Sequence, residues 1–326
     1  MNHAEAAHPA FRIIDRLAGQ ARPDEAGEIA AGLAAEPAAI SPKYFYDALG
    51  CRLFQAICEL PEYYVTRTEA GVFEAQRGKI AAAAGSGRQL VDLGAGDCQK
   101  AACWFPVLDP CRYVAVDVAR GIVESALAEF AAEMPNAEFI GVIDDFFGAL
   151  NLDGVLGPEP VTFFYPGSSI GNFTPDQALR FMAQMRGYCS APGSGLLIGV
   201  DLVKDRRVME RAYDDATGVT AAFNKNVLNH INRIAGGNFD PGMFRHVGLF
   251  NTDESRIEMH LEAIEDQTVS IAGITRRFAR GERIHTENSC KYTLESFGAL
   301  LRRAGFARIA QWTDERGWFG VFFAAP

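Results

Sequence analysis

The sequence predicts an α/β protein with a doubly wound, mostly parallel sheet, and three observations support this class. Short apolar runs, typical of strands buried on both faces, alternate with helical patterns. The first run, residues 90–93, ends in a turn at Gly94 and Gly96, where the backbone can approach a ligand closely. The second run ends in Asp117, and an acid about 20 residues past a glycine turn usually binds a ribose hydroxyl in nucleotide-binding sheets.

The glycine turn lacks the third glycine of the dinucleotide fingerprint. Counting G-x-G-x-x-G from Gly94 places Gln99 at the last position, where close packing of helix against strand needs a small residue. This disfavours NAD and favours an adenosine ligand without a pyrophosphate, such as S-adenosylmethionine. Two glycines and a distant acid often occur together by chance, so the motif alone is weak evidence.

The other elements of this fold follow in order. Helices are predicted over residues 69–84, from 99, over 122–130 and from 175, and further strands over residues 138–142, 161–165 and 196–201. A helix over residues 294–304 then precedes two strands, 309–312 and 319–323, around a polar turn. Five parallel units followed by a helix and an antiparallel hairpin are the class I methyltransferase (Rossmann-like) order.

Polar residues follow two of these strands at the carboxyl edge, where open α/β sheets bind ligands. Asp145 and Phe146 come after the third strand; the acid suits the exocyclic amine of adenine and the ring suits stacking. A solvated acid and a core phenylalanine fit this pattern equally well. Asn172 comes after the fourth strand, just before a capping box that begins a helix at Pro175; an ordinary turn asparagine is the alternative.

Two stretches lie outside this order and predict a split second α+β domain that binds the substrate. Residues 1–66 contain two expected short helices, 10–17 and 24–33, followed by an aromatic segment that either packs on the body or lines a pocket. Residues 204–292 read first as helices and then as strands, with apolar and charged residues alternating over 256–263. The nucleotide-binding core would then comprise residues 67–203 and 293–326.

Composition excludes several classes of partner. The 326 residues carry a net charge of −10, which offers no basic surface to a nucleic acid. The seven cysteines are scattered and the six histidines dispersed, so we expect reduced thiols and no metal. No apolar run approaches the ~20 residues of a membrane span, and no signal-peptide core is visible. We expect a cytoplasmic monomer.

The chain resembles the histidine Nα-methyltransferases of ergothioneine biosynthesis over nearly its whole length after residue 40. The resemblance lies in long blocks in the right order: PKYFYDALG, LPEYYVTRTEA, LVDLGAGDCQK, GSSIGNFTP, DLVKD, RAYDDATGVTAAFN and IHTENSCKY. It implies S-adenosylmethionine as cofactor and three methyl transfers to the α-amine of L-histidine, giving trimethylhistidine (hercynine). The implied cofactor-binding residues are Gly94, Gly96, Lys100, Asp117, Asp145 and Phe146, and the implied substrate-binding residues are Tyr63, Asn172, Tyr213, Met259, Glu287 and Ser289.

The chemistry needs these residue types. Asn172 and Tyr213 offer donors to a carboxylate without a buried charge. Glu287 accepts from the imidazole, and Ser289, two positions on along the same strand face, satisfies the other ring nitrogen. Tyr46 and Tyr63 are candidates to orient the amine and tolerate the growing cation, with no dedicated strong base. We therefore assign Tyr46, Tyr63 and Asn172 to catalysis.

Some positions depart from the family pattern or stay open. Asn288, between Glu287 and Ser289, should face away from the pocket, and Pro166 should spare Asn172. Met259 matches a pocket position but also fits a plain core methionine.

Three alternatives remain from the sequence. The first is a methyltransferase of the same fold that acts on another amino acid or amine. The second is an oxidoreductase, which Gln99 disfavours. The third is a non-catalytic binding protein, which would yield no methylated product.

Overall fold

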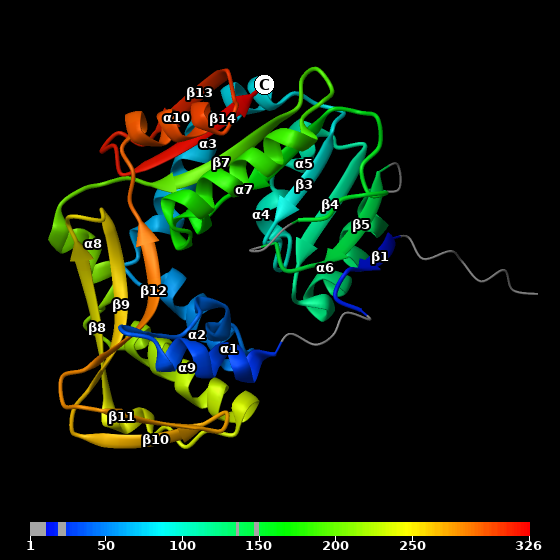
Figure 1. Ribbon diagram of the computed structural model, residues 1–326. Helices are drawn as coiled ribbons and strands as arrows, with labels where there is room; N and C mark the ends of the chain where they lie inside the picture. The colour runs from blue at the N-terminus through cyan, green and yellow to red at the C-terminus, as the bar shows by residue number, and fades with distance from the viewer. Residues whose placement is uncertain (1–10, 19–23, 135–136, 147–149) are drawn as a thin grey trace, which may run out of the picture.

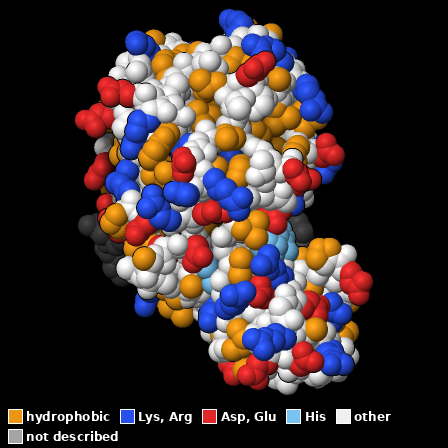
Figure 2. Space-filling view, turned by 90° about the vertical axis from the view of Figure 1, so that its left-hand side faces the viewer, with side chains coloured by type: hydrophobic (Ala, Val, Ile, Leu, Met, Phe, Trp, Pro, Cys, Tyr) orange, Lys and Arg blue, Asp and Glu red, His pale blue; other side chains and the backbone are white. Residues whose placement is uncertain are grey.

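A computed structural model of the chain describes residues 11–18, 24–134, 137–146 and 150–326. The molecule has two parts, an eight-stranded sheet covered by helices and a smaller four-stranded sheet that also carries helices (Figure 1). A view of one side shows basic and acidic side chains intermixed over both parts (Figure 2). None of the described helices combines the length and apolar character that crossing a bilayer requires.

The large sheet confirms the predicted doubly wound fold. Its strand order is β1-β5-β4-β3-β6-β7-β14-β13, parallel throughout except for the pairings of β14 with β7 and with β13. The order reverses at β3, which creates a crevice at the carboxyl ends of the strands. The strands are β1 (Phe11–Asp15), β3 (Gln89–Leu93), β4 (Arg112–Asp117), β5 (Glu138–Ile143), β6 (Val161–Tyr165), β7 (Gly195–Asp201), β13 (Arg308–Thr313) and β14 (Phe319–Ala325).

Alternate side chains of the sheet belong to two cores on its two faces. Leu90 packs in one core with residues of α3 and α6, whereas its neighbour Val91 packs in the other with residues of α7 and α10. The predicted capping box is present, since the Thr174 and Gln177 side chains each accept a backbone hydrogen bond from the other residue. The helices of this part are α3 (Tyr64–Ala84), α4 (Gln99–Ala102), α5 (Phe105–Leu108), α6 (Arg120–Glu133), α7 (Pro175–Tyr188), α10 (Leu294–Arg303) and the 3₁₀ turn η2 (Ser169–Asn172).

The expected helix over residues 10–17 is wrong, and residue 10 lies outside the described residues. Phe11–Asp15 forms β1, which pairs in parallel with β5 and covers backbone groups that would otherwise be exposed at the sheet edge. The Ile13 side chain lies over Gly141, where an added Cβ would come within 2.5 Å of its Cδ1 atom. Five residues are too few for their periodicity to separate a strand from a helix. β1 therefore belongs to the large sheet, unlike α1, β2, η1 and α2 of the same N-terminal segment.

The second part combines residues of the N-terminal segment with those between β7 and α10. Its sheet has the order β2-β12-β9-β8, and α1 and α2 pack against α9. Alternation along β9 is confirmed, and its polar face is covered as well, because arginines and a histidine pair with Glu258 and Glu262. The elements are α1 (Glu25–Ala34), β2 (Ala38–Ala39), η1 (Pro42–Phe45), α2 (Ala48–Glu59), α8 (Arg206–Tyr213), α9 (Val219–Ala235), η3 (Pro241–Met243), β8 (Phe244–Asn251), β9 (Arg256–Ala263), β10 (Gln267–Ile271), β11 (Ile274–Phe278) and β12 (Arg283–Cys290).

The chain leaves the large sheet and returns to it at neighbouring points. Leu202, just after β7, forms a parallel bridge with Tyr292, just after β12. The Val203 amide donates to the Tyr292 carbonyl, and the Tyr292 amide donates to the Asp201 carbonyl. In Figure 1, β12 runs from the second sheet up to the large one beside this crossing. The positions of the crossing support our proposed domain boundaries near residues 203 and 292.

Candidate active site

A pocket between the two parts brings together side chains that are far apart in the sequence. Tyr46, Tyr63, Asn172, Tyr213, Met259, Glu287 and Ser289, all singled out from the sequence, lie in its wall. Gly171 packs so closely on β12 that an added Cβ would lie 3.1 Å from the Cys290 carbonyl oxygen and 3.4 Å from Ser289 Oγ. This contact holds η2, which carries Asn172, against β12, which carries Ser289. Further lining residues are Phe54, Ile57, Gly167, Ser168, Ser169, Ala212, Thr220 and Phe223.

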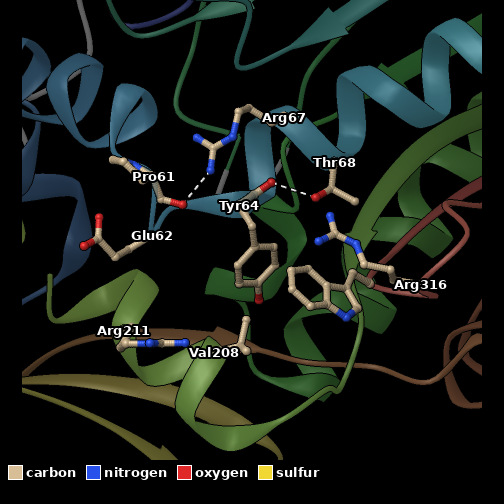
Figure 3. A pocket seen from close by; sticks show the side chains of 9 residues that line it. Pro61, Glu62, Tyr64, Arg67, Thr68, Val208, Arg211 and Arg316 are labelled. Atoms are coloured by element: carbon tan, nitrogen blue, oxygen red, sulfur yellow. Dashed lines mark hydrogen bonds between the residues drawn. The ribbon is translucent and has the colours of Figure 1, made fainter.

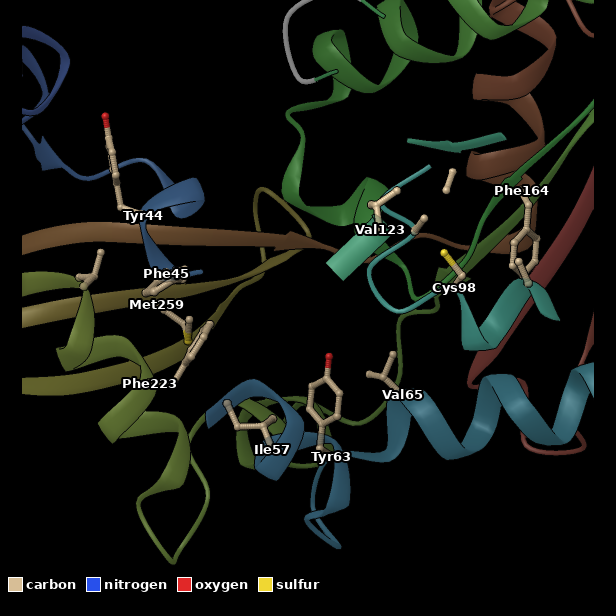
Figure 4. Packing of buried hydrophobic residues seen from close by; sticks show 14 of the residues in the cluster. Tyr44, Phe45, Ile57, Tyr63, Val65, Cys98, Val123, Phe164, Phe223 and Met259 are labelled. Atoms are coloured by element: carbon tan, nitrogen blue, oxygen red, sulfur yellow. The ribbon is translucent and has the colours of Figure 1, made fainter. Parts of the chain in front are cut away.

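Aromatic rings form one side of the pocket. Tyr46 and Phe54 each lie about 6 Å from Phe223, at 6.0 and 6.1 Å between ring centroids, and Tyr63 and Tyr213 meet edge to face at 6.1 Å. Figure 4 shows Tyr63 extending into the space between the parts, with Phe223 and Met259 on neighbouring elements. Burial raises the pKa of Tyr63 well above its usual value, so its hydroxyl stays protonated and is no base near neutral pH.

Glu287 is the buried acid of the pocket. It is 8% exposed, and no described group donates a hydrogen bond to its carboxylate. Burial raises its pKa to about 7, and the positive charge of Lys291 opposes this rise only in part. Asn288 is turned away as expected, since its side-chain oxygen lies 2.9 Å from Nε2 of His285. A buried carboxyl without a partner is costly unless a ligand supplies one.

Lys291 was not singled out from the sequence, yet it contacts two of the expected substrate residues. Its ammonium donates to the Tyr213 hydroxyl at 3.0 Å and to Ser289 Oγ at 2.9 Å, and these two oxygens lie 2.8 Å apart. The signal was present, because Glu287, Ser289 and Lys291 are spaced by two and therefore share one side of an extended segment. Because lysines are rarely buried, a lysine at this position would be expected to point into solvent rather than into the pocket wall.

The glycine turn after β3 forms the other side of the crevice. Gly94 and Gly96 have φ of +69° and +52°, a conformation that other residues adopt only with strain. The Asp117 carboxylate at the end of β4 accepts from the Gly96 amide at 2.9 Å and from the Ala119 amide at 2.9 Å. Phe146 lies over the turn, since an added Cβ on Gly94 would be 3.7 Å from its ring. Four of the expected cofactor residues thus lie together.

Lys100 and Asp145, the remaining expected cofactor residues, also lie near this edge. Lys100 pairs with Glu69 at 2.8 Å, and the other oxygen of the same carboxylate accepts from the Gly167 amide at 2.6 Å. Glu69 is 1% exposed, so one buried acid ties α4 to the loop after β6. Asp145 is partly exposed directly before Phe146.

A larger cavity of about 490 Å³ lies behind Tyr64 and contains none of the expected site residues. Figure 3 shows the Tyr64 ring at its centre, with arginines from α3, α8 and the β13–β14 turn around it. Among the described residues, no group of three or more His, Cys, Asp or Glu side chains is placed to hold a metal ion.

Comparison with known proteins shows the family of this chain. A family model described as "Histidine-specific methyltransferase, SAM-dependent" matches residues 25–326. A histidine N-alpha-methyltransferase of Mycolicibacterium smegmatis is 42% identical over 91% of this chain and 93% of its own length. The Mycobacterium tuberculosis protein of the same name is 39% identical over 91% and 94%, and N-methyltransferase imqF of Aspergillus flavus is 27% identical over 95% and 87%. The chain therefore belongs to the family of histidine-specific, S-adenosylmethionine-dependent methyltransferases.

Proposed function

We propose that this protein transfers three methyl groups to the α-amine of L-histidine, giving hercynine for ergothioneine biosynthesis. One observation carries the choice of substrate: Glu287, which is buried and has no hydrogen-bond partner for its carboxylate among the described residues, faces the same pocket as Ser289 two residues along β12. A neutral imidazole has one donor and one acceptor nitrogen, which matches a carboxylate beside a hydroxyl. A side chain without these groups would leave the acid buried and unpaired.

We further propose how the rest of histidine lies. Asn172 and Tyr213, which both line the pocket, would donate to the carboxylate, because both offer neutral donors. The amine would then face Tyr46 and Tyr63, toward the glycine turn. Their rings attract a cation, and so they tolerate the positive charge that grows with each methylation. Since burial keeps the Tyr63 hydroxyl protonated, water takes the proton that the amine loses.

The residues at the glycine turn fit the cofactor. When bound, S-adenosylmethionine supplies a methyl group on a sulfonium. Asp117 ends β4 with a carboxylate suited to the ribose hydroxyls, and Gly94 and Gly96 leave room for a close approach of the backbone. We propose that Asp145 and Phe146 receive the adenine and that Lys100 helps to close the site. The protein's own contribution to catalysis is mainly the alignment of the amine.

A methyltransferase of the same fold acting on another amine is the second candidate, since the 27% identical relative carries only the general name N-methyltransferase. Incubating the protein with S-adenosylmethionine and a mixture of free amino acids, followed by mass spectrometry, separates the two. We expect a gain of three methyl groups on histidine alone. Methylation of a different amino acid would establish the second candidate, and no methylated product would refute both.

The cellular compartment and the oligomeric state are also proposals. We propose that the protein is cytoplasmic, supported by the scattered cysteines, all of which are free. We also propose that it is a monomer. Cell fractionation and light scattering at several concentrations test the two statements.

A further inference from the structure

A cluster of buried charges lies where the chain crosses between the two parts of the molecule. Asp201 at the end of β7 receives Lys291 at 2.7 Å on one oxygen and Lys204 at 2.5 Å on the other. All three side chains are at most 3% exposed. The Tyr64 hydroxyl donates to the carboxylate at 2.7 Å and accepts from Lys204 at 2.8 Å. Two ammonium groups and one carboxylate leave the cluster with one excess positive charge.

The two lysines have different surroundings. Lys204 uses its three donors on Asp201, Tyr64 and the Leu202 carbonyl, so its contacts stay within the crossing. Lys291 uses one donor on Asp201 and the other two on Tyr213 and Ser289, in the wall of the substrate pocket. Lys291 also lies over the Tyr213 ring, 4.6 Å from its centroid. Only the second lysine therefore joins the crossing to the pocket.

The three contacts of Lys291 have a consequence for hydrogen bonding in the pocket. An ammonium group only donates, so each hydroxyl oxygen has already accepted one bond. The bond between Tyr213 and Ser289 then uses one of the two hydroxyl protons. The remaining proton has no acceptor within this triangle and is left for a ligand. The pair thus presents a donor beside the acceptor Glu287, which is the complement of a neutral imidazole. When Tyr213 turns its proton toward the carboxylate of the substrate, the Ser289 proton is free for the ring nitrogen.

We propose that Lys291 is a positioning residue of the histidine pocket: it fixes the direction of the Tyr213 and Ser289 hydroxyls and anchors them to the large sheet through Asp201. The inference rests on the proposed function. Asp201 is the last residue of β7 and lies at the carboxyl edge of the sheet, where the methyl donor would bind. The contact of Lys291 with Asp201 therefore holds the substrate at a defined place relative to that donor. Asp201 also donates its backbone amide to Ser168 Oγ at 2.8 Å, a second link from the same residue to the pocket wall.

The test compares Lys291→Met with Lys204→Met as the matched control. Both variants remove a buried ammonium from the same carboxylate, so the control tests whether the loss of one charge partner of Asp201 by itself changes the KM. We expect Lys291→Met to raise the KM for histidine by roughly tenfold or more, as two charge-assisted hydrogen bonds are lost. Lys204→Met should leave this KM within about twofold. The Kd for S-adenosylmethionine should be unchanged in both variants, because neither lysine lies at the glycine turn.

A double-mutant cycle separates positioning from a general loss of structure. In a Tyr213→Phe/Ser289→Ala background, Lys291→Met should have little further effect on the KM, because the hydroxyls that it orients are absent. If Lys291→Met does not fold, Lys291→Gln carries the same comparison. An equal KM for the Lys291 and Lys204 variants, or an undiminished effect in the background lacking both hydroxyls, overturns the inference. Failure of the wild-type protein to methylate histidine would instead refute the proposed function.

Discussion

The two sides of the crevice are built in different ways. The side on which we propose that the cofactor binds comes largely from residues 94–117, where Gly94, Gly96 and Asp117 meet through backbone conformation and two backbone hydrogen bonds to one carboxylate. The substrate side takes side chains from both parts of the molecule, from Tyr46 to Ser289. A backbone-built site can serve any reaction that uses the same donor, whereas a site built from distant side chains can change its ligand residue by residue.

The largest expected effect removes the imidazole partners. In Glu287→Ala/Ser289→Ala, kcat/KM for histidine should fall by roughly a thousandfold, since one charged and one neutral hydrogen bond are lost. Affinity for S-adenosylmethionine, measured by calorimetry, should stay the same. Asn288→Ala is the matched control, because its side chain pairs with His285 away from the pocket. A comparable loss in the control, or retained histidine turnover in the double variant, would contradict our assignment.

The second prediction concerns pH and the buried acid. The pKa of Glu287 is about 7 in the folded protein, against an ordinary value of 4.5. Between pH 4.5 and about pH 7, Glu287 is therefore protonated in the folded protein and ionised in the unfolded chain. Stability should therefore fall as the pH rises through this window. Glu287→Gln lacks this proton, so its free energy of unfolding relative to wild type should rise by about 3 kcal/mol across the window.

Urea unfolding at several pH values measures this difference. Asp92 has a pKa of about 7 for the same reason of burial, but it is present in both proteins and cancels in the comparison. A difference that does not change with pH would show that Glu287 is not buried in the free protein.

A smaller effect is expected on the cofactor side. Asp117→Asn should weaken S-adenosylmethionine binding by roughly 10- to 100-fold, the range for a lost charged hydrogen bond. The KM for histidine at saturating cofactor should change little, because Asp117 does not line the substrate pocket. A large rise in this KM would mean that the two sides are not separable.

The smallest effect should come from the sheet edge, far from both sides. Ile13→Ala removes the contact of β1 over Gly141 and should cost about 1 kcal/mol of stability, since Ile13 is only partly buried. Thermal unfolding measures the cost, and both the KM for histidine and the Kd for the cofactor should be unchanged. A changed KM or Kd would show that β1 influences the binding of substrate or cofactor.

Local signals explain how much of the fold was predictable. β6 and the start of α7 match their predicted residues, because a continuous apolar run and a capping box are written in neighbouring positions. β1 was misassigned because its state depends on an edge supplied by β5, far along the chain.

The substrate side shows the limit of such signals. Helices were expected in the first half of residues 204–292, where α9 lies, but a helical period says which face is buried and not what lies against it. Phe223 of α9 lines the pocket, and so does Phe54 of the aromatic segment, which was expected either to pack on the body or to line a pocket. Lys291 was missed because its buried charge is compensated by Asp201, which lies at the end of another strand and far away in the sequence.

The neighbouring exit and return of the chain at Leu202 and Tyr292 make residues 204–292 a cassette whose two ends meet. The large sheet takes no strand from this segment, so its exchange would leave the strand order of that sheet unbroken. New acceptor molecules can then evolve, or be engineered, by swapping the cassette together with its N-terminal partner helices while the methyl donor stays the same.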